Sequence, residues 1–174
     1  MSVIIIREYD SPIGTLRLGD FHNRLCLCDW KYSKRHTRNC QRLLQATASL
    51  FLEGDSPLLN ETIRQLDKYF SHDLLAFDLP LSPAGTDFQK KIWNSLMAIP
   101  YNKTTTYCAV ARVIGRPLSN MAVANAIASN PISIIIPCHR VIGADGTLTG
   151  YAGGLNAKQA LLNLEAGIKI HPLL

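Results

Sequence analysis

Two short helical segments separated by a glycine-containing break constrain the fold of this chain more than any other feature. The first runs from about residue 106 to 114 and stops at Gly115-Arg116-Pro117. The second runs from about 119 to 129 and stops at Asn130-Pro131. Because glycine suits a tight turn and a proline disfavours helix in the residue before it, the pattern predicts a helix-turn-helix.

The second segment of this pair is rich in alanine, at positions 122, 124, 126 and 128. Small side chains let the backbone of a helix lie close to another body. Close packing against a core helix explains the same pattern, so the sequence leaves both interpretations open.

Helix signals continue on the N-terminal side of this pair. Thr86-Asp87-Phe88-Gln89 is a capping box, in which the side chains of the first and fourth residues satisfy each other's backbone amides. Ile92, Leu96 and Ile99 follow on one face, and the helix is expected to end before Pro100.

The C-terminal side predicts a strand, a hairpin and a last helix. Residues 132–136 form an apolar, strand-like run that ends at Pro137. Residues 141–150 contain Asp-Gly, which suits a two-residue hairpin turn, so a hairpin resembling a wing is expected there. The last helix is expected to begin after an N-cap at Asn156 and to end at Gly167.

The N-terminal half reads as a small sheet followed by a helix. Residues 3–7 and 15–18 predict a β-hairpin, and residues 25–30 predict a third strand. A helix is expected from Asn60 onward, and the proline-containing stretch 79–85 is the best candidate linker. We therefore expect two domains, at residues 1–85 and 86–174.

Charge supports this division. Residues 1–85 hold ten Lys/Arg and ten Asp/Glu, whereas residues 86–174 hold eight Lys/Arg and three Asp/Glu. The whole net charge of +5 thus lies in the second half, which favours a polyanionic partner, although an ordinary basic protein would show the same balance.

The chain shows no membrane-spanning run of about 18 apolar residues and no secretory leader, so we expect a cytoplasmic protein. Its five cysteines are odd in number and follow no disulfide framework. Cys26 and Cys28 are expected to point to one face of a strand, where His22, His36 and Cys40 could complete a zinc site, but the spacing is unlike that of usual zinc sites.

The segment Pro137-Cys138-His139-Arg140 carries the clearest chemistry. A neighbouring base and cation are expected to lower the pKa of a thiol, and the thiolate is the nucleophile. Adjacent side chains of an extended segment point apart, so His139 needs either a turn at Cys138 or a bridging water to take the proton. A carboxylate elsewhere should hold the imidazole, while simple burial of a structural cysteine is the competing explanation.

At this point the chain resembles the methylated-DNA–protein-cysteine methyltransferases, also called O6-alkylguanine-DNA alkyltransferases. The similarity is strong over about residues 86–167 and looser in the N-terminal half. The motifs that carry it are Thr86-Asp87-Phe88-Gln89, Trp93, Ile99-Pro100-Tyr101, Asn130-Pro131, Ile136-Pro137-Cys138-His139-Arg140-Val141, Gly150-Tyr151-Ala152-Gly153-Gly154 and Leu161-Leu162 with Glu165, and more loosely Asp10-Ser11-Pro12-Ile13-Gly14 and Leu66-Asp67-Lys68-Tyr69-Phe70.

The resemblance implies an α+β fold, in which an N-terminal α/β domain with an antiparallel sheet precedes a winged helix-turn-helix-like catalytic domain. It implies a monomer that binds duplex DNA in the minor groove and flips O6-alkylguanine, or also O4-alkylthymine, out of the stack. The alkyl group then passes once to the protein, without metal or cofactor.

The resemblance also implies residue roles. Cys138 would accept the alkyl group, His139 would act as base through a water, and Glu165 would orient His139. Tyr107 would protonate the leaving guanine and Asn130 would bond nearby backbone. The residues implied to contact DNA or the flipped base are Met121, Ala122, Arg140, Val141, Tyr151, Ala152 and Gly153.

Three positions depart from the family pattern. Met121 stands where an arginine usually enters the gap left by the flipped base, and we expect weaker DNA binding or slower repair as a result. Ala152 replaces a common serine, and Asn102 replaces a common glycine.

The alternatives to this reading are a weakly active or non-catalytic sensor of alkylation damage, a plain winged-helix transcription factor and a cysteine hydrolase. Met121 is compatible with the sensor alternative, whereas the presence of Cys138 argues against it. A transcription factor would need no thiol beside an imidazole. A hydrolase would need an oxyanion hole that no sequence element announces.

Overall fold

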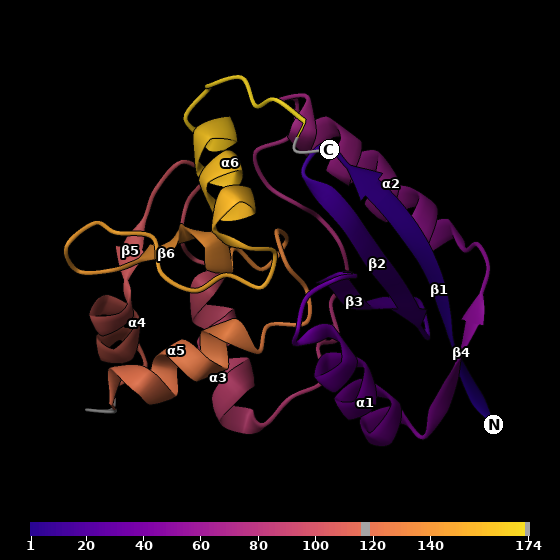
Figure 1. Cartoon of the computed structure of the whole chain (residues 1–174). Helices are drawn as coiled ribbons and strands as arrows, with labels where there is room; N and C mark the ends of the chain where they lie inside the picture. Colours follow the sequence, from indigo (N-terminus) through magenta and orange to yellow (C-terminus); the bar gives the residue numbers. More distant parts are fainter. Residues whose placement is uncertain (116–118, 173–174) are drawn as a thin grey trace.

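The computed structural model of the chain, shown in Figure 1, describes residues 1–115 and 119–172. The break predicted at Gly115-Arg116-Pro117 therefore lies mostly outside the described residues. The helices and strands, in chain order, are β1 (Ser2–Ser11), β2 (Gly14–Phe21), β3 (Arg24–Trp30), α1 (His36–Thr47), β4 (Ser49–Glu53), α2 (Pro57–Phe70), α3 (Asp87–Leu96), β5 (Thr105–Thr106), α4 (Tyr107–Val113), α5 (Asn120–Ala128), the 3₁₀ turn η1 (Cys138–Arg140), β6 (Val141–Ile142) and α6 (Leu155–Glu165).

The N-terminal half is a four-stranded sheet with the order β3-β2-β1-β4. The predicted hairpin and third strand are confirmed, because β1, β2 and β3 pair antiparallel. Strand β4, which the sequence analysis did not predict, joins the edge parallel to β1. The sheet is therefore mixed, since α1 carries the chain back across it before β4 begins.

Two helices cover the sheet, as Figure 1 shows. Helix α2 packs on β1, β2 and β3, and α1 packs against β3 and β4. The side chains of Ile4 and Ile6 share a core cluster with Leu43 of α1, whereas Leu18 shares another with Leu66 of α2. Because side chains alternate along a strand, these clusters lie on opposite faces of the sheet.

Helix α2 begins earlier than predicted. Its N-cap is Ser56, whose hydroxyl accepts a hydrogen bond from the amide of Leu59, and Pro57 occupies the first helical position. Proline is favoured there because its missing N–H would have no intrahelical partner. The predicted start at Asn60 is therefore wrong by one turn.

The pair of cysteines in β3 is also split. The register between β2 and β3 shifts at Gly19/Asp20, so that Asp20 pairs with Leu25 while Gly19 pairs with Leu27. Cys26 is the extra residue of this bulge and lies in the cluster under α1, whereas Cys28 lies in the other cluster. The expectation that both thiols share a face is wrong, because a β-bulge breaks the alternation.

The C-terminal half confirms the three helices predicted at its start. The capping box at Thr86 begins α3, and Thr106 and Ser119 cap α4 and α5 by accepting bonds from amides three residues on. These helices pack on one another. The last helix begins two residues earlier than predicted, at Leu155, with Gly154 and not Asn156 as N-cap, at φ 89°.

The predicted wing hairpin does not form as two paired strands. Gly143 and Thr147 close a turn, but β6 instead pairs in parallel with β5. The Asp-Gly signal at 145–146 thus predicted the turn correctly. The strand that pairs with β6, however, is β5, which lies about 35 residues earlier in the chain.

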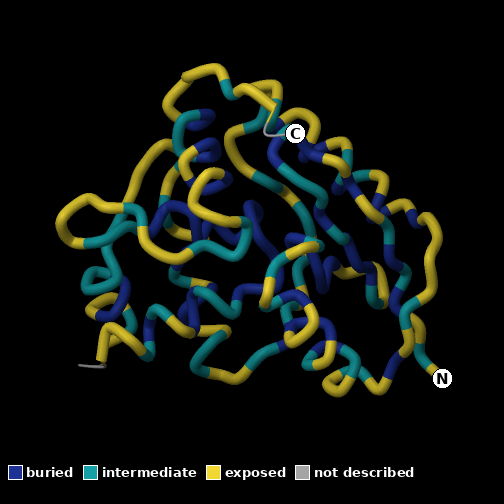
Figure 2. Tube along the Cα trace, viewed as in Figure 1, coloured by how far each residue is buried: buried dark blue, intermediate teal, exposed yellow. Residues whose placement is uncertain are grey.

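One core connects the two halves. The larger cluster contains Leu18 and Leu66 from the first half together with Trp93 and Leu161 from the second. Backbone bonds add to this contact, because the amide of Cys28 donates to the carbonyl of Pro131, and the amide of Ser133 donates to that of Cys28. Every residue from 130 to 141 is buried, and Figure 2 shows dark-blue tube concentrated in the centre of the molecule.

Among the described residues no helix is long and apolar enough to cross a membrane.

Candidate active site

The segment that leads to Cys138 is a folded loop and not the predicted strand. The side chain of Asn130 bonds it at both ends, accepting from the amide of Ile132 and donating to the carbonyl of Ile136, each at 2.9 Å. Ile134 adopts a φ of 69°, which a β-branched residue rarely does. The apolar run was misread because a segment buried on all sides needs no strand partner to be apolar.

Cys138 is the first residue of the 3₁₀ turn η1. A turn at this position was one of the two conditions under which His139 could take the thiol proton, the other being a bridging water. Its side chain is buried and lines a cavity of about 10 Å³, a volume of about one water molecule or methyl group. The other residues around this cavity are Ile127, Ala128, Asn130, Ser133, Gly150, Tyr151 and Ala152.

The expectation of a lowered thiol pKa is wrong for this state of the protein. Burial raises the pKa of Cys138 to about 11, although the amide of Asn130 and the ammonium group of Lys158 oppose the shift. Removing water disfavours the charged thiolate more than these groups stabilise it. The thiol therefore needs a base to ionise at neutral pH.

His139 directly follows Cys138 in η1, and its surroundings decide whether its ring is charged. Its Nε2 lies 2.8 Å from Glu165 Oε1, and the side chain is fully buried. Because a carboxylate accepts, we assign the proton to Nε2, which leaves Nδ1 bare. Within the described residues Nδ1 has no hydrogen-bond partner. Burial lowers the pKa of His139 in spite of Glu165, so the ring stays neutral and Nδ1 can accept a proton.

Glu165, at the end of α6, collects donors from several elements. Oε1 accepts from the Tyr69 hydroxyl and from Arg140 Nη2, each at 2.8 Å, in addition to His139. Oε2 accepts from Arg140 Nε at 2.9 Å and from the amide of Asn102 at 3.2 Å. Burial alone would raise the pKa of this carboxyl, but the bonds from His139 and Arg140 lower it to about 2.

The side chain of Arg140, a predicted DNA contact, is directed into the protein. Its side chain is 9% exposed, and its guanidinium bonds Glu165 and, through Nη1, the carbonyl of Ile99 at 2.7 Å. The planar guanidinium matches a carboxylate well, and a buried carboxylate needs such a partner. Its charge is thus used inside the protein.

Lys158 is a site residue that the sequence analysis missed. It is 1% exposed, and its Nζ donates to the carbonyls of Val141 at 2.6 Å and Thr149 at 2.9 Å. Burial lowers its pKa. A lysine three residues before Leu161, on the apolar face of α6, is the signal that could have revealed it.

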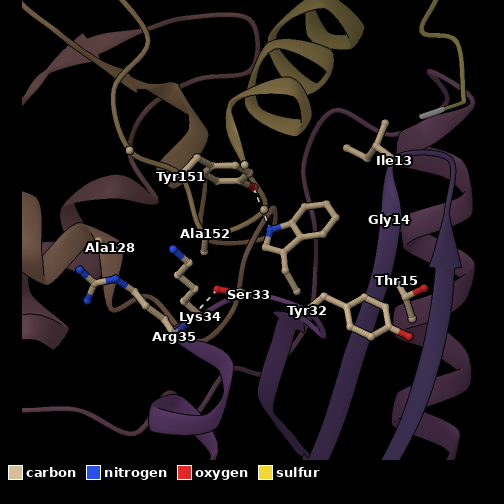
Figure 3. Close-up of a pocket in the computed structure, with 14 residues that line it drawn as sticks. Ile13, Gly14, Thr15, Tyr32, Ser33, Lys34, Arg35, Ala128, Tyr151 and Ala152 are labelled. Carbon is tan, nitrogen blue, oxygen red and sulfur yellow. Dashed lines mark hydrogen bonds between the residues drawn. The ribbon is translucent and has the colours of Figure 1, made fainter. Parts of the chain in front are cut away.

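A larger pocket of about 630 Å³ adjoins the cavity of Cys138 and shares Ala128, Gly150, Tyr151 and Ala152 with it. Figure 3 shows this pocket with Tyr151 among the residues that line it. The rings of Trp30 and Tyr151 meet edge to face, with their centroids 6.0 Å apart. The indole Nε1 donates to the Tyr151 hydroxyl at 3.3 Å. A Cβ at Gly153 would lie 2.6 Å from the Trp30 ring, so only glycine permits this approach.

Tyr107 and Met121 lie apart from the thiol cavity. Both line a separate surface pocket of about 310 Å³ between α4 and α5. The Tyr107 hydroxyl donates to the carbonyl of Thr149 at 3.2 Å. Met121 is 74% exposed, and Ala122 beside it is partly exposed.

Of the suggested zinc ligands, His36 and Cys40 lie in contact, but His36 and Cys26 each have another partner. His36 bonds Asp29 through Nδ1, and Cys40 lies against the opposite ring nitrogen at 3.5 Å. Cys26 bonds the carbonyl of Gly19. In residues 1–115 and 119–172 no three His, Cys, Asp or Glu side chains converge on a point that could hold a metal ion.

Family models match both halves of the chain. Residues 4–83 match the ribonuclease-like domain of 6-O-methylguanine DNA methyltransferase, and residues 87–167 match the DNA-binding domain of the same family.

Individual relatives agree. A methylated-DNA–protein-cysteine methyltransferase of Methanosarcina barkeri is 58% identical over 156 residues, covering 90% of this chain and 93% of that protein. The protein of the same name from Methanosarcina acetivorans is 42% identical and covers 90% of this chain and 95% of its own length. The structure of Mycobacterium tuberculosis OGT in complex with DNA matches with a TM-score of 0.81 at 40% identity, covering 94% of this chain and 93% of that one.

The mixed fold, the buried cysteine beside a histidine–carboxylate pair and these matches agree, and the chain belongs to the 6-O-methylguanine DNA methyltransferase family, the methylated-DNA–protein-cysteine methyltransferases.

Proposed function

We propose that this protein repairs duplex DNA by moving the alkyl group of O6-alkylguanine onto Cys138, once per molecule. The observation that carries the proposal is the arrangement of Cys138 beside a neutral His139 whose Nε2 is held by Glu165 and whose Nδ1 is bare. A nucleophile, a base and a group that orients the base are the parts that such a transfer requires.

The transfer proceeds as a displacement at carbon. His139 Nδ1 takes the thiol proton of Cys138 through one bridging water, and the sulfur attacks the alkyl carbon. The bond between that carbon and O6 breaks, and guanine leaves with the bond's electron pair. Tyr107, released from Thr149, supplies a proton to the leaving base. The product is a thioether, which has no easy hydrolytic route, so the protein is consumed.

The α5 helix is the element proposed to enter the minor groove. The exposed side chain of Met121 suits a wedge between stacked bases, and Ala122 allows the helix backbone to approach. The flipped base would lie against Val141, Tyr151, Ala152 and Gly153. Among the described residues of this half, the exposed cations that remain for phosphates are Lys90, Lys91, Lys103, Arg112 and Lys169.

The remaining expectations extend this proposal. The protein acts as a monomer in the cytoplasm, residues 1–85 and 86–174 form its two domains, and O4-alkylthymine is a second substrate. The small cavity at Cys138 favours methyl as the transferred group.

A mass measurement tests the proposal. The protein is incubated with duplex DNA that carries O6-methylguanine and is then digested with trypsin. Because Arg116 precedes a proline, cleavage yields a peptide of residues 113–140, in which Cys138 is the only cysteine. We expect this peptide to gain one methyl group, at most once per molecule, with no gain from unmethylated DNA.

Variants make the test specific. Cys138→Ala should gain nothing, whereas Cys108→Ala, which removes a thiol near the exposed face of α5, should behave as the wild type. Binding of the methylated duplex without any mass gain would indicate the damage sensor. Repeated turnover of esters would indicate the hydrolase.

A further inference from the structure

A single oxygen of Glu165 serves both halves of the molecule. Oε1 accepts the hydrogen bond of His139 Nε2 at 2.8 Å and that of the Tyr69 hydroxyl, also at 2.8 Å. Tyr69 belongs to α2, and 96 residues separate it from Glu165 in the chain. The group that orients the base therefore has a partner outside the C-terminal half.

Packing explains the ring of Tyr69 but not its hydroxyl. The ring is 1% exposed and contacts Phe70, Phe77 and Tyr101, with centroids 5.3 to 6.3 Å away. A phenylalanine would make the same apolar contacts. The hydroxyl has Glu165 as its partner, and burial together with that carboxylate raises the pKa of Tyr69 well above 10. Tyr69 thus stays protonated and can only donate to the carboxylate.

We propose that Tyr69 is a positioning residue for alkyl transfer, acting through Glu165 on His139. This inference rests on the function proposed above and assigns the N-terminal half a direct part in it.

The effect follows from competition for one acceptor atom. While Tyr69 donates to Oε1, part of the carboxylate's charge is neutralised, and the pull on the Nε2 proton of His139 is weaker. Without the hydroxyl, Glu165 stabilises a charged imidazolium more, so His139 is protonated up to a higher pH and is a less available base. The other charged groups that act on His139 are Arg140 and Lys158, and neither changes in the test below.

Tyr69→Phe tests the proposal with a control from the same protein. Tyr9 also donates to a carboxylate, Asp67 Oδ1 at 2.7 Å, but this pair lies outside the network of Glu165. Tyr69→Phe should slow methyl transfer at neutral pH roughly three- to tenfold and move the acid limb of its pH profile upward. Both variants should lower the midpoint of thermal unfolding by similar amounts. Tyr9→Phe, however, should leave the rate of methyl transfer and its pH profile unchanged.

A double-variant cycle checks that the route passes through Glu165. In a Glu165→Gln background, Tyr69→Phe should no longer shift the pH profile. The ratio of the transfer rates measured without and with Tyr69→Phe should approach one. An undiminished effect in that background would show that Tyr69 acts elsewhere and would overturn the inference.

Nuclear magnetic resonance gives a readout that needs no DNA. In the free protein, Tyr69→Phe should shift the Nε2–H resonance of His139 downfield, and Tyr9→Phe should leave it in place. If the wild type transfers no methyl group but this shift appears, the proposed function fails and the coupling stands. If the wild type transfers methyl and Tyr69→Phe matches Tyr9→Phe in rate, pH profile and resonance, the function stands and Tyr69 is merely structural.

Discussion

Two buried histidines in this molecule each bond a carboxylate and each lie beside a cysteine. His36 of α1 bonds Asp29 at 3.0 Å and lies 3.5 Å from the sulfur of Cys40, one helical turn away. His139 bonds Glu165 at 2.8 Å and directly follows Cys138. The residue types match, but the charge states do not.

The pKa values of the two rings shift in opposite directions. The bond to Asp29, helped by Cys40, raises the pKa of His36 to about 9. Burial lowers the pKa of His139 although Glu165 opposes it, and the cations Arg140 and Lys158 add to the lowering. His36 is therefore a cation at neutral pH, and His139 is neutral.

Burial explains most of the contrast, because the His139 side chain is fully buried whereas that of His36 is 10% exposed, and the partners of each carboxylate add to it. Glu165 is already bonded by Arg140, so it needs no positive charge from His139. Asp29 receives its other side-chain bond from the neutral amide of Asn39, and His36 supplies the charge. Full burial and the nearby cations thus keep His139 neutral, whereas the bonds to Asp29 and Cys40 keep His36 charged.

The largest expected effect separates the two histidines by activity. His139→Gln should slow methyl transfer at least about 100-fold, because it removes the proposed base. His36→Gln should stay within about threefold of the wild type, because His36 serves the fold. The measurement is the rate of methyl gain on peptide 113–140 in single-turnover experiments. Equal losses in both variants would contradict the distinction.

The second effect concerns stability. The pKa of His36 lies above its ordinary value of 6.5, so its contribution is full below about pH 6.5 and is lost as the pH rises through about 9. We expect a loss of about 3 kcal/mol in the free energy of unfolding. Urea titrations between pH 6 and pH 10 should show this loss in the wild type and not in His36→Gln.

His139 has the opposite sign in the same titrations. Its pKa lies below the ordinary value, so the unfolded chain binds the proton more readily and stability falls as the pH drops below about 6.5. His139→Gln should remove that part of the acid loss. A wild type without any loss between pH 6.5 and 9 would show that His36 is neutral.

The smallest expected effect concerns the contribution of the Cys40 sulfur to the raised pKa of His36. Cys40 is the second contributor to the raised pKa of His36, so Cys40→Ala should move the alkaline loss of stability to lower pH. Methyl transfer should be unchanged, because the proposed acceptor is Cys138. The same urea titrations measure the shift, and an unchanged or higher midpoint would show that the sulfur does not support the charge.

Local signals predicted much of the fold. The capping box at Thr86 located α3, and the breaks at Gly115-Arg116-Pro117 and Asn130-Pro131 located α4 and α5. The short runs 3–7 and 15–18 located the hairpin of β1 and β2. Each of these signals is local, because it depends on residues a few positions apart, which a sequence displays directly. Helix α1 was not predicted, because its N-cap makes no side-chain hydrogen bond and few of its residues are apolar.

Predictions that depended on distant partners failed more often. Residues 132–136 form a folded loop and not the expected strand, and Val141–Ile142 pairs with β5 and not within a 141–150 hairpin. In both cases the deciding partner lies far along the chain: β3 for the loop and β5 for the hairpin segment.

The sequence by itself determined the helix-turn-helix pattern, the basic second half and the thiol–imidazole motif at Cys138 and His139. Only the tertiary structure decided that Arg140 and Lys158 are buried, that His139 is neutral and that Tyr69 reaches Glu165. The physical reason is that propensity and capping are local, whereas desolvation and charge pairing sum over every group that folding brings near.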